Sequence, residues 1–280
     1  MQVIRTVSEL VTWRNAQRAA GRRIGFVPTM GYLHDGHLAL CRTARPEVAC
    51  LAASIFVNPL QFGPTEDLSR YPRDEAGDLA KLASVGVDMV FLPTPEEMYP
   101  AGFATQVSVE GLTEGLCGAS RPGHFAGVTT VVCKLFNLMG AQAAYFGLKD
   151  YQQFKVIEKL VQDLCMDVQV FGVPTVREAD GLAMSSRNAY LSAKGRQAAV
   201  VLSRALSQAE RLYQAGERHP ETLEAAARAV IAQEPLAVVE YVEVVDADTL
   251  QRPKSPSRLV MALAVKVEKT RLIDNRMLGG

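Results

Sequence analysis

The sequence predicts an α/β protein, in which a parallel sheet covered by helices on both faces is followed by a smaller α+β C-terminal domain. Over about the first 175 of its 280 residues, apolar strand-like runs alternate with stretches of helical spacing. Most of these runs are continuously apolar, which is typical of strands buried on both faces of a sheet. After Pro174, helical stretches are followed by strands with no helix between them, which favours a small antiparallel sheet.

The first expected element is a helix that begins at a capping box. Thr6 and Glu9 form the T-x-x-E pattern, and the helix is expected to end near Gly21. The strands expected next are 24–28, 48–57, 87–93, 143–147 and 168–174, and the helices between them are 36–44, 74–86, 124–140 and 150–166. For the C-terminal part we expect helices over 193–217 and 220–233 and strands over 238–250, 257–269 and 270–275.

This order of elements predicts two domains, 1–175 and 176–280. The polar, turn-rich segment 176–192 lies at their junction, and we interpret it as a hinge. Clefts between domains are natural ligand sites, so we expect the smaller domain to cover the functional site.

Composition and charge exclude several classes of function. Lys plus Arg and Asp plus Glu each total 30, so the net charge gives no basis for binding nucleic acid or an anionic membrane. No apolar stretch reaches the ~20 residues of a membrane span, and the N-terminus lacks the apolar segment of a signal peptide. Five cysteines without a C-x-x-C pair indicate buried free thiols in a reducing compartment. We therefore expect a cytoplasmic protein without nucleic-acid or membrane partners.

Polar segments follow three of the expected strands, and a fourth lies just beyond the last strand. Because ligands of open parallel sheets bind beyond the carboxyl ends of the strands, these segments predict a ligand site. The segments are TMGYLHDGH after strand 24–28, NPLQFG after 48–57, GLKDYQQF after 143–147, and MSSRN at 184–188.

His34 and His37 stand about one turn apart where a helix begins. A helix N-terminus offers unpaired N–H groups and a partial positive charge, which suit a phosphate, and the neighbouring glycines permit close approach. A metal site would need further ligands, but the other histidines are His124 and His219, and no H-E-x-x-H motif is present. Phosphate binding, metal binding and simple capping of the helix all remain open from the spacing alone.

Positive charge and hydroxyl groups gather in two of the polar segments. Lys149 stands where a strand gives way to a helix and suits a phosphate, while Asp150 suits a helix cap or a ribose hydroxyl. Arg187 can form forked bonds to phosphate oxygens, with Ser185 and Ser186 as further donors. A solvated lysine and a plain serine-rich turn are the alternatives.

Two glutamines suit a small polar ligand, because an amide both donates and accepts hydrogen bonds. They are Gln61 and Gln153, each near the end of a neighbouring strand. Arg121 and His124 lie at a further helix start and are additional ligand candidates. The sequence has no P-loop, no G-x-G-x-x-G fingerprint and no G-x-S-x-G elbow, so these nucleotide sites and hydrolase chemistry are unsupported.

Together these segments resemble the HIGH-type nucleotidyltransferase superfamily, which binds ATP through H-x-G-H histidines and a KMSKS-like loop. Five longer strings are similar to the pantothenate synthetase (pantoate–β-alanine ligase) family, in order and spacing, over about the first 190 residues. They are FVPTMGYLHDGHLAL, SIFVNPLQFGPTEDLSRYPR, RPGHFAGVTTVVCKLFN, YFGLKDYQQ and VPTVREADGLAMSSRN. The remainder resembles the small C-terminal domain of that family in layout.

The resemblance implies a fold and a reaction. Residues 1–175 would form a Rossmann-like domain that binds the nucleotide and pantoate, and residues 176–280 would cover the active site. The enzyme would join (R)-pantoate to β-alanine with ATP through a pantoyl adenylate and release AMP and pyrophosphate, a step of pantothenate biosynthesis on the coenzyme A pathway. Mg²⁺ would accompany the triphosphate without protein ligands of its own, and the family is usually dimeric, which implies a homodimer.

The resemblance also assigns residues by position. Those expected to contact ATP are Met30, Gly31, Tyr32, Leu33, His34, Asp35, Gly36, His37, Gly147, Leu148, Lys149, Asp150, Val176, Met184, Ser185, Ser186 and Arg187. Those expected to contact pantoate or β-alanine are Gln61, Gln153 and Asn58. The catalytic residues implied are His37, as proton donor, His34 and Lys149. The family often has an acidic or amide residue where this chain has Leu148, so no side-chain role is carried over to that position.

Two other functions compete with this prediction. An adenylyl transferase of the same superfamily would transfer AMP to a phosphorylated acceptor and would not need the two glutamines. A regulatory module would bind ATP without turnover.

Overall fold

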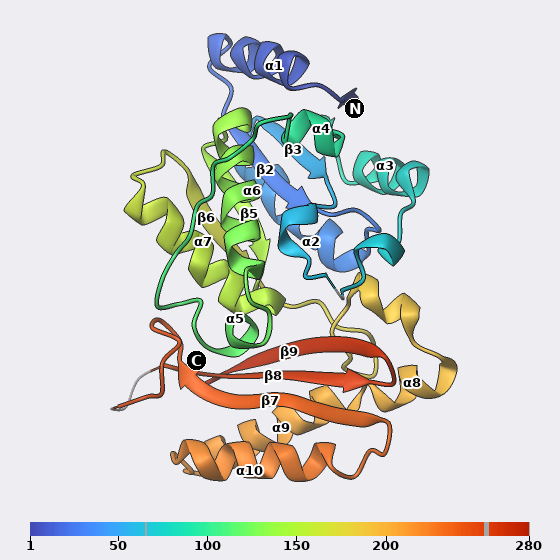
Figure 1. Cartoon of the computed structure of the whole chain (residues 1–280), viewed down its shortest axis with the longest axis vertical. Helices are drawn as coiled ribbons and strands as arrows, with labels where there is room; N and C mark the ends of the chain where they lie inside the picture. The colour runs from blue at the N-terminus through green and yellow to red at the C-terminus, as the bar shows by residue number, and fades with distance from the viewer. Residues whose placement is uncertain (65, 255–257, 280) are drawn as a thin grey trace. The chain divides into compact units, whose positions relative to one another are not determined.

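The computed structural model describes residues 1–64, 66–254 and 258–279, which divide into two compact units (Figure 1). The N-terminal unit comprises Met1–Val109, Arg121–Leu148 and Val156–Pro174, and the C-terminal unit comprises Glu110–Ser120, Lys149–Lys155 and Thr175–Gly280. The main division therefore falls next to Pro174, but two short segments from the first part of the chain belong with the second. Residue 257, the first of an expected strand, lies outside the described ranges.

Six parallel strands form the sheet of the N-terminal unit, in the order β1-β4-β3-β2-β5-β6. They are β1 (Gln2–Ile4), β2 (Ile24–Thr29), β3 (Cys50–Ile55), β4 (Met89–Phe91), β5 (Ala143–Gly147) and β6 (Gln169–Val173). From the central β2 the chain moves outward through β3 and β4, then returns to the other side of β2 for β5 and β6. The order therefore reverses between β2 and β5, which is where parallel sheets bind ligands.

Both faces of this sheet are buried. On one face, Val27 and Leu51 belong to a cluster with Leu40 of α2 (Asp35–Ala44) and Leu82 of α3 (Glu75–Ser84). On the other face, the Phe26 ring meets Phe136 of α6 (His124–Met139) edge-on, with centroids 6.5 Å apart. Successive residues of each strand thus enter different apolar layers, which explains the continuous apolar runs and confirms the predicted architecture.

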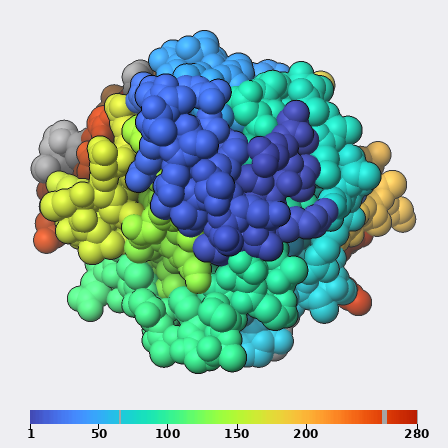
Figure 2. All heavy atoms as spheres, turned by 90° about the horizontal axis from the view of Figure 1, so that it is seen from above, coloured from blue at the N-terminus to red at the C-terminus, as the bar shows by residue number. Residues whose placement is uncertain are grey.

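The remaining helices of this part of the chain are α1 (Val7–Ala19), α4 (Pro95–Met98) and α7 (Tyr151–Asp163). The predicted capping box at the start of α1 is present, with Thr6 and Glu9 bonded to each other's backbone N–H groups. Strand β1 was not predicted, because three residues are too few to show a pattern. Figure 2 shows the N-terminal residues, in dark blue, at the surface of this unit.

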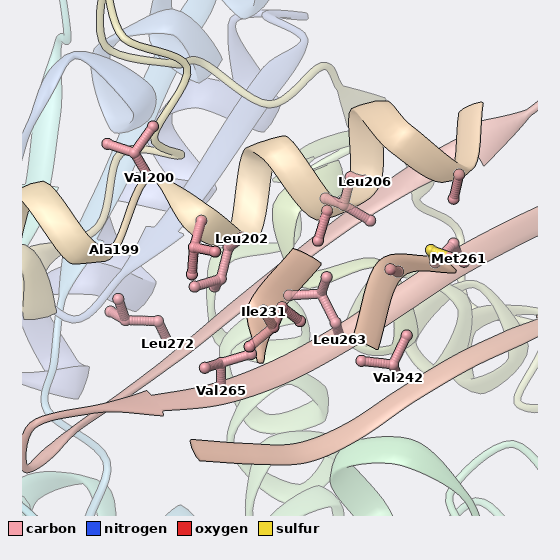
Figure 3. Close-up of a cluster of buried hydrophobic side chains, with 14 of the residues drawn as sticks. Ala199, Val200, Leu202, Leu206, Ile231, Val242, Met261, Leu263, Val265 and Leu272 are labelled. Carbon is pink, nitrogen blue, oxygen red and sulfur yellow. The ribbon is translucent and has the colours of Figure 1, made fainter. Parts of the chain in front are cut away.

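The C-terminal unit carries an antiparallel sheet of β7 (Ala237–Asp246), β8 (Leu259–Val267) and β9 (Thr270–Leu278). Its helices include α5 (Leu116–Ser120), α8 (Ala193–Ala198), α9 (Val201–Gln214) and α10 (Pro220–Ile231). Figure 3 shows Leu202, Leu206 and Ile231 from the helices beside Leu263 and Val265 of β8. The α+β prediction is confirmed, but the helix expected over 193–217 is two helices that break at Ala199–Val200.

The cysteines and the membrane prediction can be compared with the described ranges. All five cysteines are free thiols, and Cys41, Cys50 and Cys117 are buried. Cys133 is only half-buried and Cys165 is exposed, so the expectation of uniformly buried thiols was wrong. Cys165 lies in the turn after α7, where its φ of 48° ends the helix. Within these ranges no helix is long and apolar enough to cross a membrane.

Candidate active site

The loop after β2 has an unusual backbone. Gly31 and Tyr32 both adopt left-handed conformations, with φ of 83° and 50°. A Cβ on Gly31 would come within 2.9 Å of Ile55 Cγ2 and 3.0 Å of Asp78 Oδ2, so only glycine fits this close approach. Tyr32 is a non-glycine residue in a sparsely populated region, and the surrounding structure must hold it there.

Asp78 of α3 supplies that support. Its buried carboxylate accepts hydrogen bonds from the backbone N–H of Tyr32 and of Leu33, each at 2.7 Å. Lys81, one turn later on α3, donates from Nζ to the Leu33 carbonyl at 2.9 Å. Burial raises the pKa of the Asp78 carboxyl, although the two backbone N–H groups and Lys81 act in the opposite direction. We did not predict Asp78, yet its i,i+4 spacing from the buried Leu82 places it on the inner face of the helix.

The two histidines cap the start of α2 reciprocally. His34 is the N-cap residue, and its Nδ1 accepts from the Gly36 N–H at 3.1 Å. The His37 Nδ1 accepts from the His34 N–H at 3.3 Å, and the ring centroids lie 4.1 Å apart. A neutral imidazole that accepts at Nδ1 carries its proton on Nε2, so each ring has its N–H donor on the Nε2 side.

The capping interpretation of these histidines is therefore confirmed. Phosphate binding is compatible with it, because capping uses Nδ1 as the acceptor and places the ring proton on Nε2. Across residues 1–64, 66–254 and 258–279, no cluster of three or more His, Cys, Asp or Glu side chains could hold a metal ion.

Asn58 and Gln61 follow β3 in a short 3₁₀ turn, Pro59–Gln61. Asn58 is almost fully buried, and its Nδ2 donates to Gln61 Oε1 and to the Gly127 carbonyl, each at 3.0 Å. Gln61 Nε2 lies 3.2 Å from the Met30 sulfur. The structure thus joins the segment after β3 to the first residue after β2, as predicted from the shared edge of the sheet.

Arg121 and His124 hold the same turn from the start of α6. Arg121 forms a two-point ion pair with Glu66, at 2.6 and 2.7 Å. His124 Nδ1 bonds the Gln61 carbonyl at 2.8 Å, and its Nε2 lies 2.9 Å from Arg121 Nη1. Since a carbonyl only accepts and a guanidinium only donates, His124 is neutral with its proton on Nδ1. These two ligand candidates therefore bond the loop that carries Gln61.

The end of β5 contributes Gly147 and then Leu148, which opens the single turn Leu148–Asp150 before α7. Strand β5 pairs directly with β2, through Gly25 with Ala143 and Phe26 with Ala144. Residues 30–37 and 147–148 therefore leave neighbouring strands at the same edge of the sheet. This edge includes the topological switch point between β2 and β5, where open parallel sheets commonly bind ligands.

In the C-terminal unit, Lys149 is held mainly through its backbone. Its carbonyl accepts from Asn275 Nδ2 at 2.7 Å, and its ammonium lies 3.8 Å from Asp150 Oδ2. Gln153 is half-buried in the first turns of α7. Its neighbour Gln152 is buried, accepts from the Cys117 N–H at 3.0 Å and donates to the carbonyls of residues 112 and 115. Gln152 is thus a structural residue, and Gln153 is the ligand candidate of the pair.

The segment from Val176 to Arg187 folds back on itself. The Met184 N–H bonds the Val176 carbonyl at 3.0 Å, and Ser185 caps a 3₁₀ turn by accepting from the Arg187 N–H at 3.3 Å. Ser186, the next residue, is buried.

Three unpredicted residues connect this segment to Lys149. Arg177 forms a two-point ion pair with the buried Asp274 of β9, at 2.7 and 2.9 Å. Arg177 also donates to the carbonyl of Asn275, whose side chain bonds Lys149. The C-terminal unit thus brings the Lys149 and Met184–Arg187 segments into one bonded network.

Comparison with known proteins decides the family. A model of the pantoate-beta-alanine ligase family matches residues 2–277. The chain belongs to this family. It is 55% identical over 276 residues to the pantothenate synthetase of Heliobacterium modesticaldum, covering 98% of each chain.

Two solved pantoate–β-alanine ligases have the same fold over their whole length. The pantothenate synthetase from Thermus thermophilus superposes with a TM-score of 0.95 at 47% identity, covering 100% of both chains. The ligase from Francisella tularensis, complexed with beta-gamma ATP and β-alanine, gives 0.83 at 33% identity and covers 100% of this chain and 99% of its own. The resemblance inferred from the five sequence strings is confirmed, and it extends through the C-terminal part.

Proposed function

We propose that this chain condenses (R)-pantoate with β-alanine in an ATP-dependent reaction that forms a pantoyl adenylate and releases AMP and pyrophosphate. The observation that carries the proposal is membership of the pantoate–β-alanine ligase family over residues 2–277. The Francisella relative, which is complexed with beta-gamma ATP and β-alanine, supports ATP as the nucleotide and β-alanine as the amine.

The reaction has two steps. A carboxylate oxygen of pantoate attacks the α-phosphorus of ATP, and the bond to the leaving pyrophosphate breaks. The amine of β-alanine then attacks the carbonyl carbon of the adenylate, loses a proton, and AMP leaves with the former carboxylate oxygen. Both steps require positioning and neutralisation of developing negative charge more than covalent help from the protein.

We propose that the segment Met30–His37, with Gly147, Leu148, Lys149, Asp150, Val176 and Met184–Arg187, binds ATP. Lys149 and Arg187 would supply positive charge, and the Nε2–H groups of His34 and His37 would donate to phosphate oxygens. The capping bonds support this role, because they fix each proton on Nε2. A hydrogen bond from His37 to a phosphate oxygen would stabilise the charge there without proton transfer.

We propose that Mg²⁺ is bound through the phosphates of ATP, where it would neutralise negative charge. This mode suits Mg²⁺, which keeps water and substrate oxygens as ligands more readily than all-protein cages. Among the residues that the structure describes, no three His, Cys, Asp or Glu side chains form a cluster that could hold a metal ion, and binding through the phosphates is compatible with this.

We propose that Gln61 and Gln153 bind pantoate and that Gln61 also borders the β-alanine position. Hydroxyl and carboxylate groups need partners that donate as well as accept, which amides provide. For the protein as a whole we propose a cytoplasmic homodimer.

An omission assay tests this function against its alternatives. The protein is incubated with ATP, Mg²⁺, pantoate and β-alanine, and each acid is then left out in turn. We expect AMP and pantothenate from the complete mixture, and pyrophosphate from ATP and pantoate alone, limited to about one equivalent of enzyme. An adenylyl transferase would not respond to pantoate, and a regulatory module would leave ATP intact. Either result would refute the proposal.

A further inference from the structure

The side chain of Asn58 has all four of its hydrogen-bonding positions occupied. Its Oδ1 accepts from the Tyr99 hydroxyl at 2.7 Å and from the Leu60 N–H at 3.3 Å. Its Nδ2 donates to Gln61 Oε1 and to the Gly127 carbonyl, each at 3.0 Å. An amide offers two donors and two acceptors, so Asn58 is saturated within the protein and acts through its neighbours.

The orientation of the Asn58 amide follows from its backbone partners. An N–H group only donates, so Leu60 must face Oδ1, and a carbonyl only accepts, so Gly127 must face Nδ2. With this orientation fixed, Tyr99 must donate to Oδ1, and Asn58 must donate to Gln61 Oε1. The chain of donors therefore runs in one direction, from Tyr99 through Asn58 to Gln61.

The same chain fixes the amide of Gln61. Its Oε1 is held by Asn58, so its NH₂ group is directed elsewhere, and Nε2 lies 3.2 Å from the Met30 sulfur. Sulfur is a weak acceptor, so this contact competes little with an oxygen acceptor of a ligand. Gln61 thus presents donors, and the ligand group that it suits is a carboxylate or hydroxyl oxygen.

Tyr99 itself is firmly placed. Its ring packs against Phe56 and Phe103, with centroid distances of 6.0 and 5.0 Å. Burial raises the pKa of the Tyr99 hydroxyl, which therefore keeps its proton and remains a donor. Tyr99 follows the short helix α4 and lies 41 residues from Asn58 in the chain, so no sequence motif connects the two.

We propose that Tyr99 is a positioning residue for substrate recognition, which acts through Asn58 to hold Gln61 with its NH₂ group available to an oxygen of pantoate. This inference rests on the proposed function, because it takes pantoate as the ligand of Gln61. It assigns a role to a residue outside the family-derived site and specifies which half of the Gln61 amide binds substrate.

The variant Tyr99→Phe tests the proposal by removing one hydroxyl and leaving the ring. We expect kcat/KM for pantoate to fall at least about tenfold, while the KM for ATP changes less than about twofold. Tyr145→Phe is the matched control, since Tyr145 is a buried tyrosine whose hydroxyl has no hydrogen-bond partner in the described structure. It should leave both parameters unchanged.

A double-mutant cycle separates positioning from a general structural effect. If Tyr99 acts through Gln61, then Tyr99→Phe should cause no further loss of single-turnover adenylation in a Gln61→Ala background. An equal fold-loss in both backgrounds would show that Tyr99 acts independently of Gln61 and would overturn the proposal, as would unchanged kinetics of Tyr99→Phe in the wild-type background.

A second variant tests the next member of the donor chain. Asn58→Asp replaces the donor to Gln61 Oε1 and to the Gly127 carbonyl with an acceptor, so in folded protein the Gln61 amide should reverse and pantoate use should fall more than in Tyr99→Phe. Normal pantoate kinetics in folded Asn58→Asp would also overturn the proposal. If the wild-type protein forms no AMP from pantoate, the proposed function itself fails, which is a different result from any of these.

Discussion

Backbone groups determine the chemical state of several candidate side chains. His34 and His37 each accept a backbone N–H at Nδ1, and Asn58 is oriented by one backbone N–H and one carbonyl. Because backbone groups cannot exchange donor and acceptor roles, they fix the tautomers and the amide orientation without a ligand. If these groups bind the substrates as proposed, they need little rearrangement to do so, which favours transition-state stabilisation by preorganised dipoles.

Lys149 gives the first prediction at this scale. We expect Lys149→Ala to slow single-turnover adenylation at least ~100-fold, about 2.7 kcal/mol, because the ammonium would neutralise charge on the phosphates. The fold should persist, since the bond from Asn275 goes to the Lys149 carbonyl and not to its side chain. Lys159→Ala on α7, where the lysine pairs with Asp163 at the surface, should adenylate normally. A folded Lys149→Ala protein with near-normal adenylation would exclude the lysine from the site.

Glu66 gives a prediction about pH. Burial alone would raise the pKa of Glu66, but the hydrogen bonds and charge of Arg121 outweigh it and hold the pKa below its ordinary value. A lowered pKa means that the carboxylate stabilises the fold above about pH 5, and that this contribution is lost as the pH falls through the folded-state pKa. Glu66→Gln should therefore be about 1–2 kcal/mol less stable at pH 7 and should lose less stability on acidification.

Urea unfolding between pH 7 and pH 3 measures both effects of Glu66→Gln. Glu75→Gln is the control, because Glu75 pairs with Arg5 on the surface, where such pairs contribute little. If the wild-type protein and Glu66→Gln lost stability in parallel on acidification, the lowered pKa of Glu66 would be contradicted.

The sequence predicted residues that stand in local motifs and missed residues that act over long chain separations. His34, His37 and Lys149 stand beside glycines at strand ends, where chemistry can be inferred from neighbours. Asp78 lies 46 residues from Tyr32, whose N–H it accepts, and no local pattern joins them. Tyr99 lies 41 residues from Asn58, and Asn275 lies 126 residues from Lys149, so their roles also depend on the folded structure.

At the scale of elements, predicted positions were most accurate where capping chemistry marks an end. The capping box at Thr6 fixed the start of α1, and Gly140 ends α6 in a left-handed conformation with φ of 58°. The break between α8 and α9 was not predicted, because the apolar spacing continues through Ala199 and Val200 into the core. The two residues at the break are buried in the hydrophobic core, and neither is a glycine or proline that would mark a helix end in the sequence.

The N-terminus of α2 gives a prediction that separates capping from ligand binding. Asparagine is a good N-cap residue, so His34→Asn should keep helix stability within about 0.5 kcal/mol while removing the imidazole Nε2–H. We expect ATP affinity to fall at least about tenfold, measured by calorimetry. His34→Ala should lose both functions, including about 1 kcal/mol of stability. Unchanged ATP affinity in His34→Asn would show that His34 caps the helix and does not bind ATP.

At the scale of the whole molecule, continuously apolar runs separated by helical stretches predicted the parallel sheet. After Pro174, strands that follow one another without helices between them predicted the antiparallel sheet. The assignment of 110–120 and 149–155 to the C-terminal unit could not be predicted. It depends on side chains such as Gln152 and Asn275, which bond backbone groups far away in the sequence. The order of strands likewise came from the fold, and it places the ends of β2 and β5 side by side.

In the proposed reaction pantoate is activated as an adenylate, and oxygen labelling follows this step through to the products. Pantoate carrying ¹⁸O in both carboxylate oxygens is incubated with the protein, ATP, Mg²⁺ and β-alanine, and the products are analysed by mass spectrometry. Because the attacking carboxylate oxygen stays on phosphorus when the amide forms, one ¹⁸O should appear in each AMP. Unlabelled AMP, or ADP with the label in inorganic phosphate, would contradict the adenylate mechanism.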